Sequence, residues 1–157
     1  MAQKMENRVE SKYTLSVTSA IFIGTTYCKL STKYAEINGK KYDYKYFSHV
    51  LDIAIGLSTN GFAPFKIWKS MAWLLIIFNY NLPPEICFHI ENILSLGAIL
   101  SPKEPVDADS FLILLIMELD HLAEGVHPFY ALESKIFALC TYLIIIFRDT
   151  PAISMLM

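Results

Sequence analysis

The amino-acid sequence predicts an α/β fold, in which one crossover helix packs on a mixed β-sheet. Apolar runs of strand length end at turn residues, an Asn-Gly pair separates two short β-forming segments, and a later segment has apolar residues at helical spacing. Three strands, one helix and a further strand follow one another in that order. This order favours a sheet whose third and fourth strands are joined across one face by the helix.

The composition is that of one globular domain. The chain has 157 residues, of which 54% are hydrophobic and 18% are charged, so it can form a core and does not resemble a disordered segment. Its net charge of -2 excludes a protein that binds nucleic acid over its whole surface, and any such contact must be local. Three cysteines without CxxC spacing exclude a disulfide framework and a structural zinc site, and they indicate an intracellular, reducing setting.

The first half of the chain contains a hairpin and a strand. Residues 1–30 are a poorly defined N-terminal segment. Its first thirteen residues are polar, and the apolar stretch 15–24 is broken by Ser16, Thr18 and Ser19, which makes a poor signal peptide. The Asn38-Gly39 pair predicts a hairpin over 34–42. Residues 52–59 alternate loosely, and we expect them to form a strand that runs into a turn at Asn60-Gly61.

Two further strands and the helix follow. The apolar run 71–79, stopped by Pro83-Pro84, predicts a strand that is buried on both faces, and 91–100 predicts a shorter strand. Residues 107–124 predict the helix. Asp107 or Asp109 can cap its amino end, and Gly125 can terminate its carboxyl end. The stripe of this helix that is expected to face the core consists of Phe111, Leu112, Leu115, Leu119 and Leu122.

The last predicted strand spans 136–147, which is apolar almost throughout and is expected to be long, central and fully buried. The predicted elements match the opening of a ribonuclease-H-like fold. Residues 31–157 are therefore expected to form an incomplete domain, truncated after the fourth core strand. In such folds, carboxylates at strand ends hold two metal ions about 3.5 to 4 Å apart, and these ions promote phosphodiester cleavage.

Four segments resemble the transposase domain of fungal CACTA (En/Spm-type, tnp2-like) elements: DIAIGLSTNGFAPF (52–65), NYNLPPEI (79–86), ENILSLGAILSPKEPVDADSFL (91–112) and FRDTPAISMLM (147–157). The resemblance implies a nuclear DDE-type enzyme that uses Mg²⁺ or Mn²⁺ to cleave DNA and transfer strands. It places the first acid of the family at Asn60 and the second at Asp149. The family's third acid is not reached, so we expect an inactive fragment that binds no metal.

The departures from the family pattern share one feature. Each can arise from a single C-to-T or G-to-A change in a codon, as cytosine deamination in a silenced repeat produces. We therefore interpret the sequence as a mutated transposon relic, in which the loss of arginines and prolines raised the mean hydropathy to +0.40. The substituted positions are Asn60, Trp68, Leu74, Cys87, Leu100, Ser101, Leu114, His127, Cys140 and Arg148.

Each candidate site residue also has a structural interpretation. Asp149 can cap a following helix, and Asn60 can occupy an ordinary turn. Lys40, Lys41 and Lys45 alternate with tyrosines in a basic patch that can contact nucleic acid, although a solvated hairpin is the simpler interpretation.

Two other functions are left open by the sequence. A truncated sheet exposes an edge, through which the chain can self-associate or bind DNA or an intact transposase as a non-catalytic module. A small helical membrane protein is the third alternative, but the longest apolar run is well short of the ~20 residues of a spanning helix. No glycine-rich phosphate loop or dinucleotide motif points to a small-molecule substrate.

Overall fold

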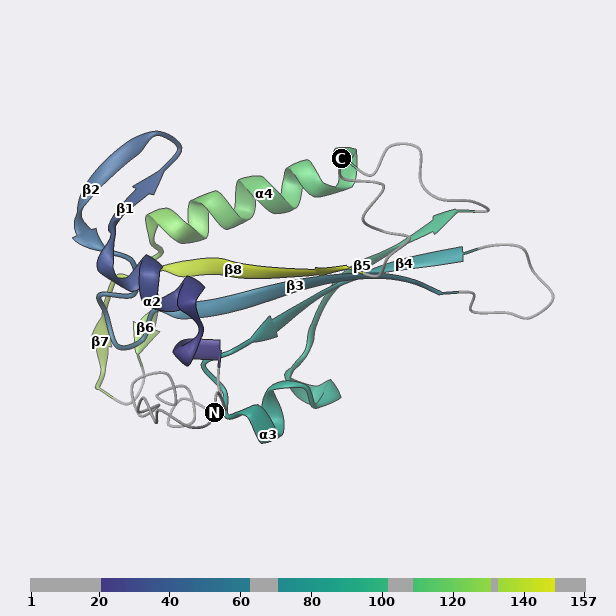
Figure 1. Cartoon of the computed structure of the whole chain (residues 1–157), viewed down its shortest axis with the longest axis horizontal. Coiled ribbons are helices and arrows are strands. Elements are labelled where there is room, and N and C mark those ends of the chain that lie inside the picture. The colour runs from purple at the N-terminus through teal and green to yellow at the C-terminus, as the bar shows by residue number, and fades with distance from the viewer. Residues whose placement is uncertain (1–20, 63–70, 102–108, 131–132, 149–157) are drawn as a thin grey trace.

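The computed structural model describes residues 21–62, 71–101, 109–130 and 133–148. Figure 1 shows its elements along the chain. In order, they are η2 (Ile21–Ile23), α2 (Thr25–Thr32), β1 (Tyr34–Ile37), β2 (Lys40–Lys45), β3 (Ile53–Phe62), β4 (Met71–Asn79), α3 (Pro84–Cys87), η3 (Ile90–Asn92), β5 (Leu94–Ser101), α4 (Asp109–Glu124), β6 (Phe129–Tyr130), β7 (Lys135–Ile136) and β8 (Thr141–Arg148).

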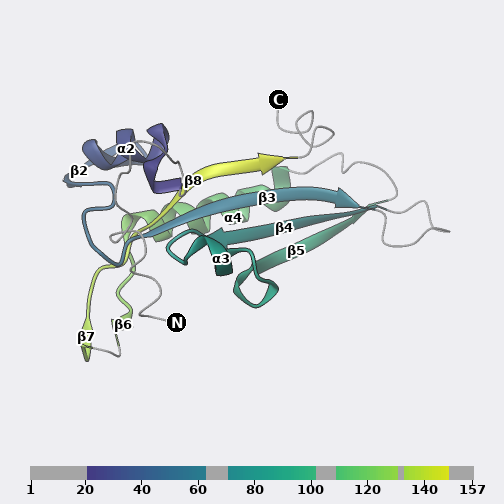
Figure 2. The same ribbon diagram turned by 60° about the horizontal axis from the view of Figure 1, so that its bottom comes forward.

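A four-stranded mixed sheet in the order β5-β4-β3-β8 forms the centre of the fold. β3 pairs antiparallel with β4, and β4 pairs antiparallel with β5, while β8 pairs parallel with β3. Parallel neighbours need a crossover connection, and here it contains α4, which lies along β8 on one face of the sheet (Figures 1 and 2). The predicted mixed sheet with a crossover helix is therefore present.

Alternation along β3 assigns its side chains to two faces. Ile55 lines a cavity together with Leu122 of α4, so this side of β3 looks toward the helix. Ala54 points the other way, into a hydrophobic core that also contains Phe22 and Tyr142. Elements that precede β3 in the chain thus contribute to this core, against which Ala123 of α4 also packs.

Helix α4 is apolar on more than one side. The predicted stripe is buried or half-buried, as seen for Leu112, Leu115, Leu119 and Leu122, whereas the side chain of Phe111 lies outside the described residues. The outer face exposes four further apolar side chains, Ile113, Leu114, Ile116 and Met117. None of the described helices is long and apolar enough to cross a membrane.

Three observed elements coincide closely with the predicted ones. The hairpin turns at Asn38 and Gly39, whose φ angles of 52° and 75° are the left-handed values that this two-residue turn requires. The strand expected over 71–79 is β4, with the same bounds. The strand expected over 52–59 is β3, which begins one residue later and continues to Phe62.

The prediction of one long central strand over 136–147 is wrong. β8 begins only at Thr141, while Ile136 belongs to the short β6–β7 pair and is 68% exposed. β8 lies at an edge of the described sheet, and Phe147 is 40% exposed. An apolar run shows that its residues are hydrophobic, but it does not show which strands are available to pair with them. Here the backbone N–H of Cys140 bonds to the Asp52 carboxylate, which fixes where pairing with β3 begins.

Two smaller differences concern the adjacent strands. The strand expected over 91–100 begins at Leu94, because the preceding residues form η3, where the Asn92 side chain donates a hydrogen bond to the Ile86 carbonyl. β4 is not buried on both faces, since only Ala72 and Trp73 of its nine residues are fully buried. The reason is that α4 lies over only part of this sheet.

Two buried polar side chains join the strands at the amino end of β3. Asp52 is 1% exposed and accepts hydrogen bonds from the backbone N–H groups of His49 (2.9 Å) and Cys140 (3.3 Å). Asn81 is fully buried, accepts a hydrogen bond from the N–H of Ala54 (2.9 Å) and donates one to the carbonyl of Asp52 (2.8 Å). Because buried backbone groups must be paired, these side chains hold β3, β8 and the segment after β4 together.

We expect that replacing Asn81 by alanine lowers the free energy of unfolding by about 2 to 4 kcal/mol, because two buried backbone groups lose their partners. Urea unfolding followed by circular dichroism measures this loss. Asn92→Ala is the matched control: it removes one half-buried hydrogen bond and is expected to lower stability by about 1 kcal/mol. Equal losses in the two variants would contradict the role assigned to Asn81.

Candidate functional site

The carboxyl ends of β3 and β8 lie side by side (Figure 1). Thr59 pairs with Arg148 in the parallel register. Asn60 follows Thr59 in β3 and pairs with Leu74 of β4. Asp149 follows Arg148 in the sequence and lies outside the described residues. The two strands that lead to the predicted acid positions are thus neighbours in one sheet.

The prediction of a turn at Asn60-Gly61 is wrong, because β3 runs through both residues. Gly61 pairs with Trp73, and a Cβ on Gly61 would come within 3.0 Å of the Cη2 atom of the indole. Trp73 is only 5% exposed. The glycine therefore makes room for an aromatic ring on the neighbouring strand. Sequence reasoning missed this contact because no local signal identifies a cross-strand partner.

The described residues do not by themselves fit a two-metal centre. Among them, no group of three or more His, Cys, Asp or Glu side chains could hold a metal ion. The sheet neighbours Thr59, Gly61 and Leu74 around Asn60 carry no carboxylate. Mg²⁺ and Mn²⁺ prefer charged oxygen ligands, and a neutral amide offsets little of the repulsion between two such ions.

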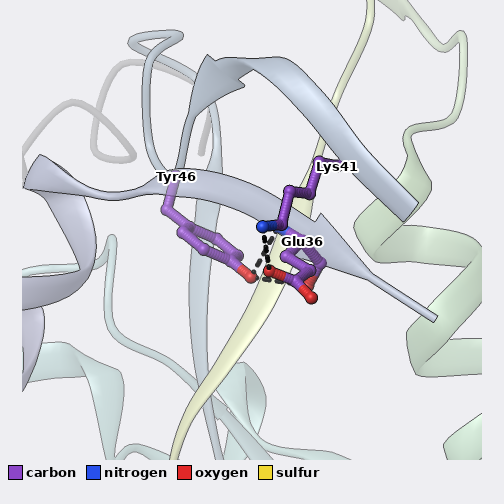
Figure 3. A network of polar contacts seen from close by, with 3 residues as sticks. All are labelled: Glu36, Lys41 and Tyr46. Carbon is purple, nitrogen blue, oxygen red and sulfur yellow. Dashed lines mark hydrogen bonds and ion pairs between the residues drawn. The ribbon is translucent and has the colours of Figure 1, made fainter. Parts of the chain in front are cut away.

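One of the three predicted nucleic-acid contacts is held in a small polar network on the β1–β2 hairpin (Figure 3). Lys41 Nζ lies 3.9 Å from Oε2 of Glu36. The hydroxyl of Tyr46 donates a hydrogen bond to the Glu36 carbonyl (2.8 Å) and accepts one from the Glu36 N–H (3.0 Å). Glu36 thus offsets part of the charge of Lys41, and the exposed pair itself adds little stability.

The other two lysines lie next to tyrosine rings. Lys40 Nζ is 4.8 Å from the centroid of the Tyr42 ring, and Lys45 Nζ is 5.9 Å from that of Tyr34. The hairpin lies at the end of the sheet where β3 and β8 begin (Figure 1), whereas Asn60 is near the end of β3. The structure therefore groups the lysines on one hairpin and separates them from Asn60.

The two buried cysteines are unsuited to nucleophilic chemistry. Burial raises the pKa of the Cys140 thiol and that of the Cys87 thiol, so both remain protonated at neutral pH. Burial also raises the pKa of the neighbouring Tyr44 phenol to about 12. Cys28, in contrast, is exposed.

Thiol labelling tests this description. At pH 8, a disulfide reagent such as DTNB is expected to react with one thiol per native chain, Cys28, and with all three in urea. Cys28→Ser serves as the control and is expected to remove the fast reaction. Rapid labelling of Cys140 in the native protein would show that its thiol is neither buried nor held protonated.

Comparison with known proteins identifies the family. The family model described as transposase family tnp2 matches residues 26–157, which includes all strands of the four-stranded sheet. No curated protein and no solved structure matches this chain. The matched region covers most of the sequence and contains both Asn60 and Asp149. The chain therefore belongs to the tnp2 transposase family.

Proposed function

We propose that this chain derives from the transposase of a fungal CACTA-type (En/Spm-like) element and is a mutated, catalytically inactive copy. The ancestral enzyme would have cleaved and joined DNA in the nucleus with Mg²⁺ or Mn²⁺. The family match supports a transposase origin. The main support for an ancestral metal site is the parallel pairing of β3 with β8, because these are the two strands that lead to the acid positions.

The strand order supports a ribonuclease-H-like ancestor. Three consecutive antiparallel strands are followed by a helix and by a fourth strand, which returns parallel to the first of the three. This is the opening that the sequence predicts for such a fold. The family resemblance then implies that metal-dependent DNA cleavage took place at the carboxyl ends of β3 and β8.

The lost charge at Asn60 accounts for the proposed inactivity. The pair Thr59↔Arg148 immediately precedes the two acid positions in the sequence, Asn60 and Asp149. In the ancestor, two acids there would have shared the metal ions. With asparagine at one position, only Asp149 supplies negative charge, and adjacent divalent cations are left without sufficient compensation.

Calorimetry tests the proposed loss of the metal site. Titration with Mn²⁺ is expected to give no stoichiometric binding below millimolar concentration, and Asn60→Asp is expected to strengthen binding, because it restores a charged oxygen ligand. Asp149→Asn in the Asn60→Asp background is the matched control and is expected to reverse the gain. Tight Mn²⁺ binding by the unaltered chain that disappears in Asp149→Asn would refute the proposal.

A non-catalytic interaction module is the second candidate, because the sheet has an apolar edge. β5 lies at one end of the strand order and contains no charged residue. Leu94, Leu96 and Leu100 are 58%, 40% and 75% exposed. A long uncharged edge strand can pair with another chain, so we propose self-association through β5.

Analytical ultracentrifugation tests the self-association. The unaltered chain is expected to form dimers or larger species as its concentration rises, and Leu100→Lys is expected to shift the distribution to monomer, since a charge blocks edge pairing. Ile136→Lys is the control, because Ile136 is similarly exposed on the separate β6–β7 pair. If Leu100→Lys left the distribution unchanged, pairing through β5 would be ruled out.

A further inference from the structure

Positive charge is concentrated at one end of the molecule. Residues 21–47 contain five lysines and two acids, Glu36 and Asp43, which gives a net charge of +3. The other described residues contain Lys135, Arg148 and eight acids, which gives a net charge of -6. Within the described residues, positive and negative charge are thus concentrated in different regions, although the net charge of the whole sequence is only -2.

The fold brings these lysines together. Lys33 lies between α2 and β1, and its carbonyl accepts a hydrogen bond from the N–H of Tyr46, which ties this junction to the end of β2 (3.2 Å). Tyr34, the next residue, pairs with Lys45 across the hairpin. Lys29 lies in the last turn of α2, about one turn before Lys33.

The remaining two lysines lie at the far end of the hairpin. Lys40 and Lys41 begin β2, and Lys45 ends it, so the positive charges extend over roughly 15 Å along the strand. All five lysines are exposed. Lys41 is the least available of them, because Glu36 lies beside it.

We propose that Lys29, Lys33, Lys40, Lys41 and Lys45 form a contact surface for the phosphate backbone of duplex DNA, here termed the α2–hairpin surface. This inference rests on the proposed transposase ancestry for the identity of the polyanion, and on the charge distribution for its place. The surface is separate from the carboxyl end of β3, so its binding needs neither a metal ion nor an intact nuclease site.

The α2–hairpin surface and Asn60 lie toward opposite ends of β3. Asn60 is seven residues beyond Ile53 along β3, or roughly 23 Å from the end of the sheet next to the hairpin. A duplex rises 3.4 Å per base pair along each strand, so one that touched both ends would need about seven base-pair steps. The net negative charge elsewhere repels the backbone and favours approach through the α2–hairpin surface.

Fluorescence anisotropy with a labelled duplex of 24 base pairs in EDTA tests the surface. The four lysines other than Lys41 predict a slope of about -2.7 to -3.6 for the logarithm of the binding constant against the logarithm of salt concentration, because Asp43, on the same face of β2 as Lys45, offsets part of its charge. The double variant Lys33→Gln and Lys45→Gln is expected to reduce that slope by about 1.8 and to weaken binding at 50 mM salt by roughly tenfold or more.

Lys135→Gln is the matched control, because Lys135 is also exposed but lies on β7, where it contacts Glu133. It is expected to leave the slope and the affinity unchanged, and Lys41→Gln is expected to have a smaller effect than Lys45→Gln. Circular dichroism confirms that each variant is folded. An effect of Lys135→Gln equal to that of the double variant would refute the α2–hairpin surface.

Equal binding to anionic phosphatidylglycerol vesicles at the same salt concentration would also overturn the assignment to DNA. The result is independent of the nuclease proposal, because binding is measured without metal. Loss of DNA binding in the double variant, together with unchanged Mn²⁺ titrations, supports the surface whatever the Asn60→Asp variant does. Retained binding in the double variant refutes the surface and leaves the proposed ancestry untouched.

Discussion

The buried pair Asp52 and Asn81 is the constraint on which the rest of the structure depends. The Asp52 carboxylate holds the N–H of Cys140 just before β8, and the Asn81 amide bridges the carbonyl of Asp52 and the N–H of Ala54. Buried polar groups are strongly destabilising when unpaired, so these bonds tolerate only one alignment of the strands. A slip of one residue would turn every side chain to the opposite face.

The alignment of β3 with β8 also affects the packing and pairing of residues far from Asp52. With the amino ends of β3 and β8 fixed, Ile55 lines a cavity with Leu122 of α4, and Ala54 belongs to the core that contains Phe22 and Tyr142. The register shifts by one residue between Ile55 and Gly56, and beyond this irregularity the pairing continues to Thr59 beside Arg148 at the other end of the sheet. The proposed loss of catalysis at Asn60 therefore requires no loss of fold, because the residues that set the register are distinct from those assigned to the chemistry.

Local patterns in the sequence were sufficient for part of the fold. The Asn38-Gly39 turn and the bounds of β4 follow from turn chemistry and hydrophobic runs, which act over a few residues. The start of β8, its edge position and the contact of Gly61 with Trp73 depend on partners that are remote in sequence. Periodicity carries no information about such partners. For the site, Asn60 and Asp149 came from family resemblance, and their roles remain predictions.

The parallel pairing of β3 with β8 also has a consequence for synthesis of the chain. Asp52 and Cys140 are 88 residues apart, so β3 leaves the ribosome long before its second neighbour. At 5 to 20 residues per second, that interval lasts roughly 4 to 18 s. During this time the antiparallel β3-β4-β5 meander can form from nearby contacts, but one edge of β3 stays open. The nascent chain is thus most exposed to misassociation before β8 arrives.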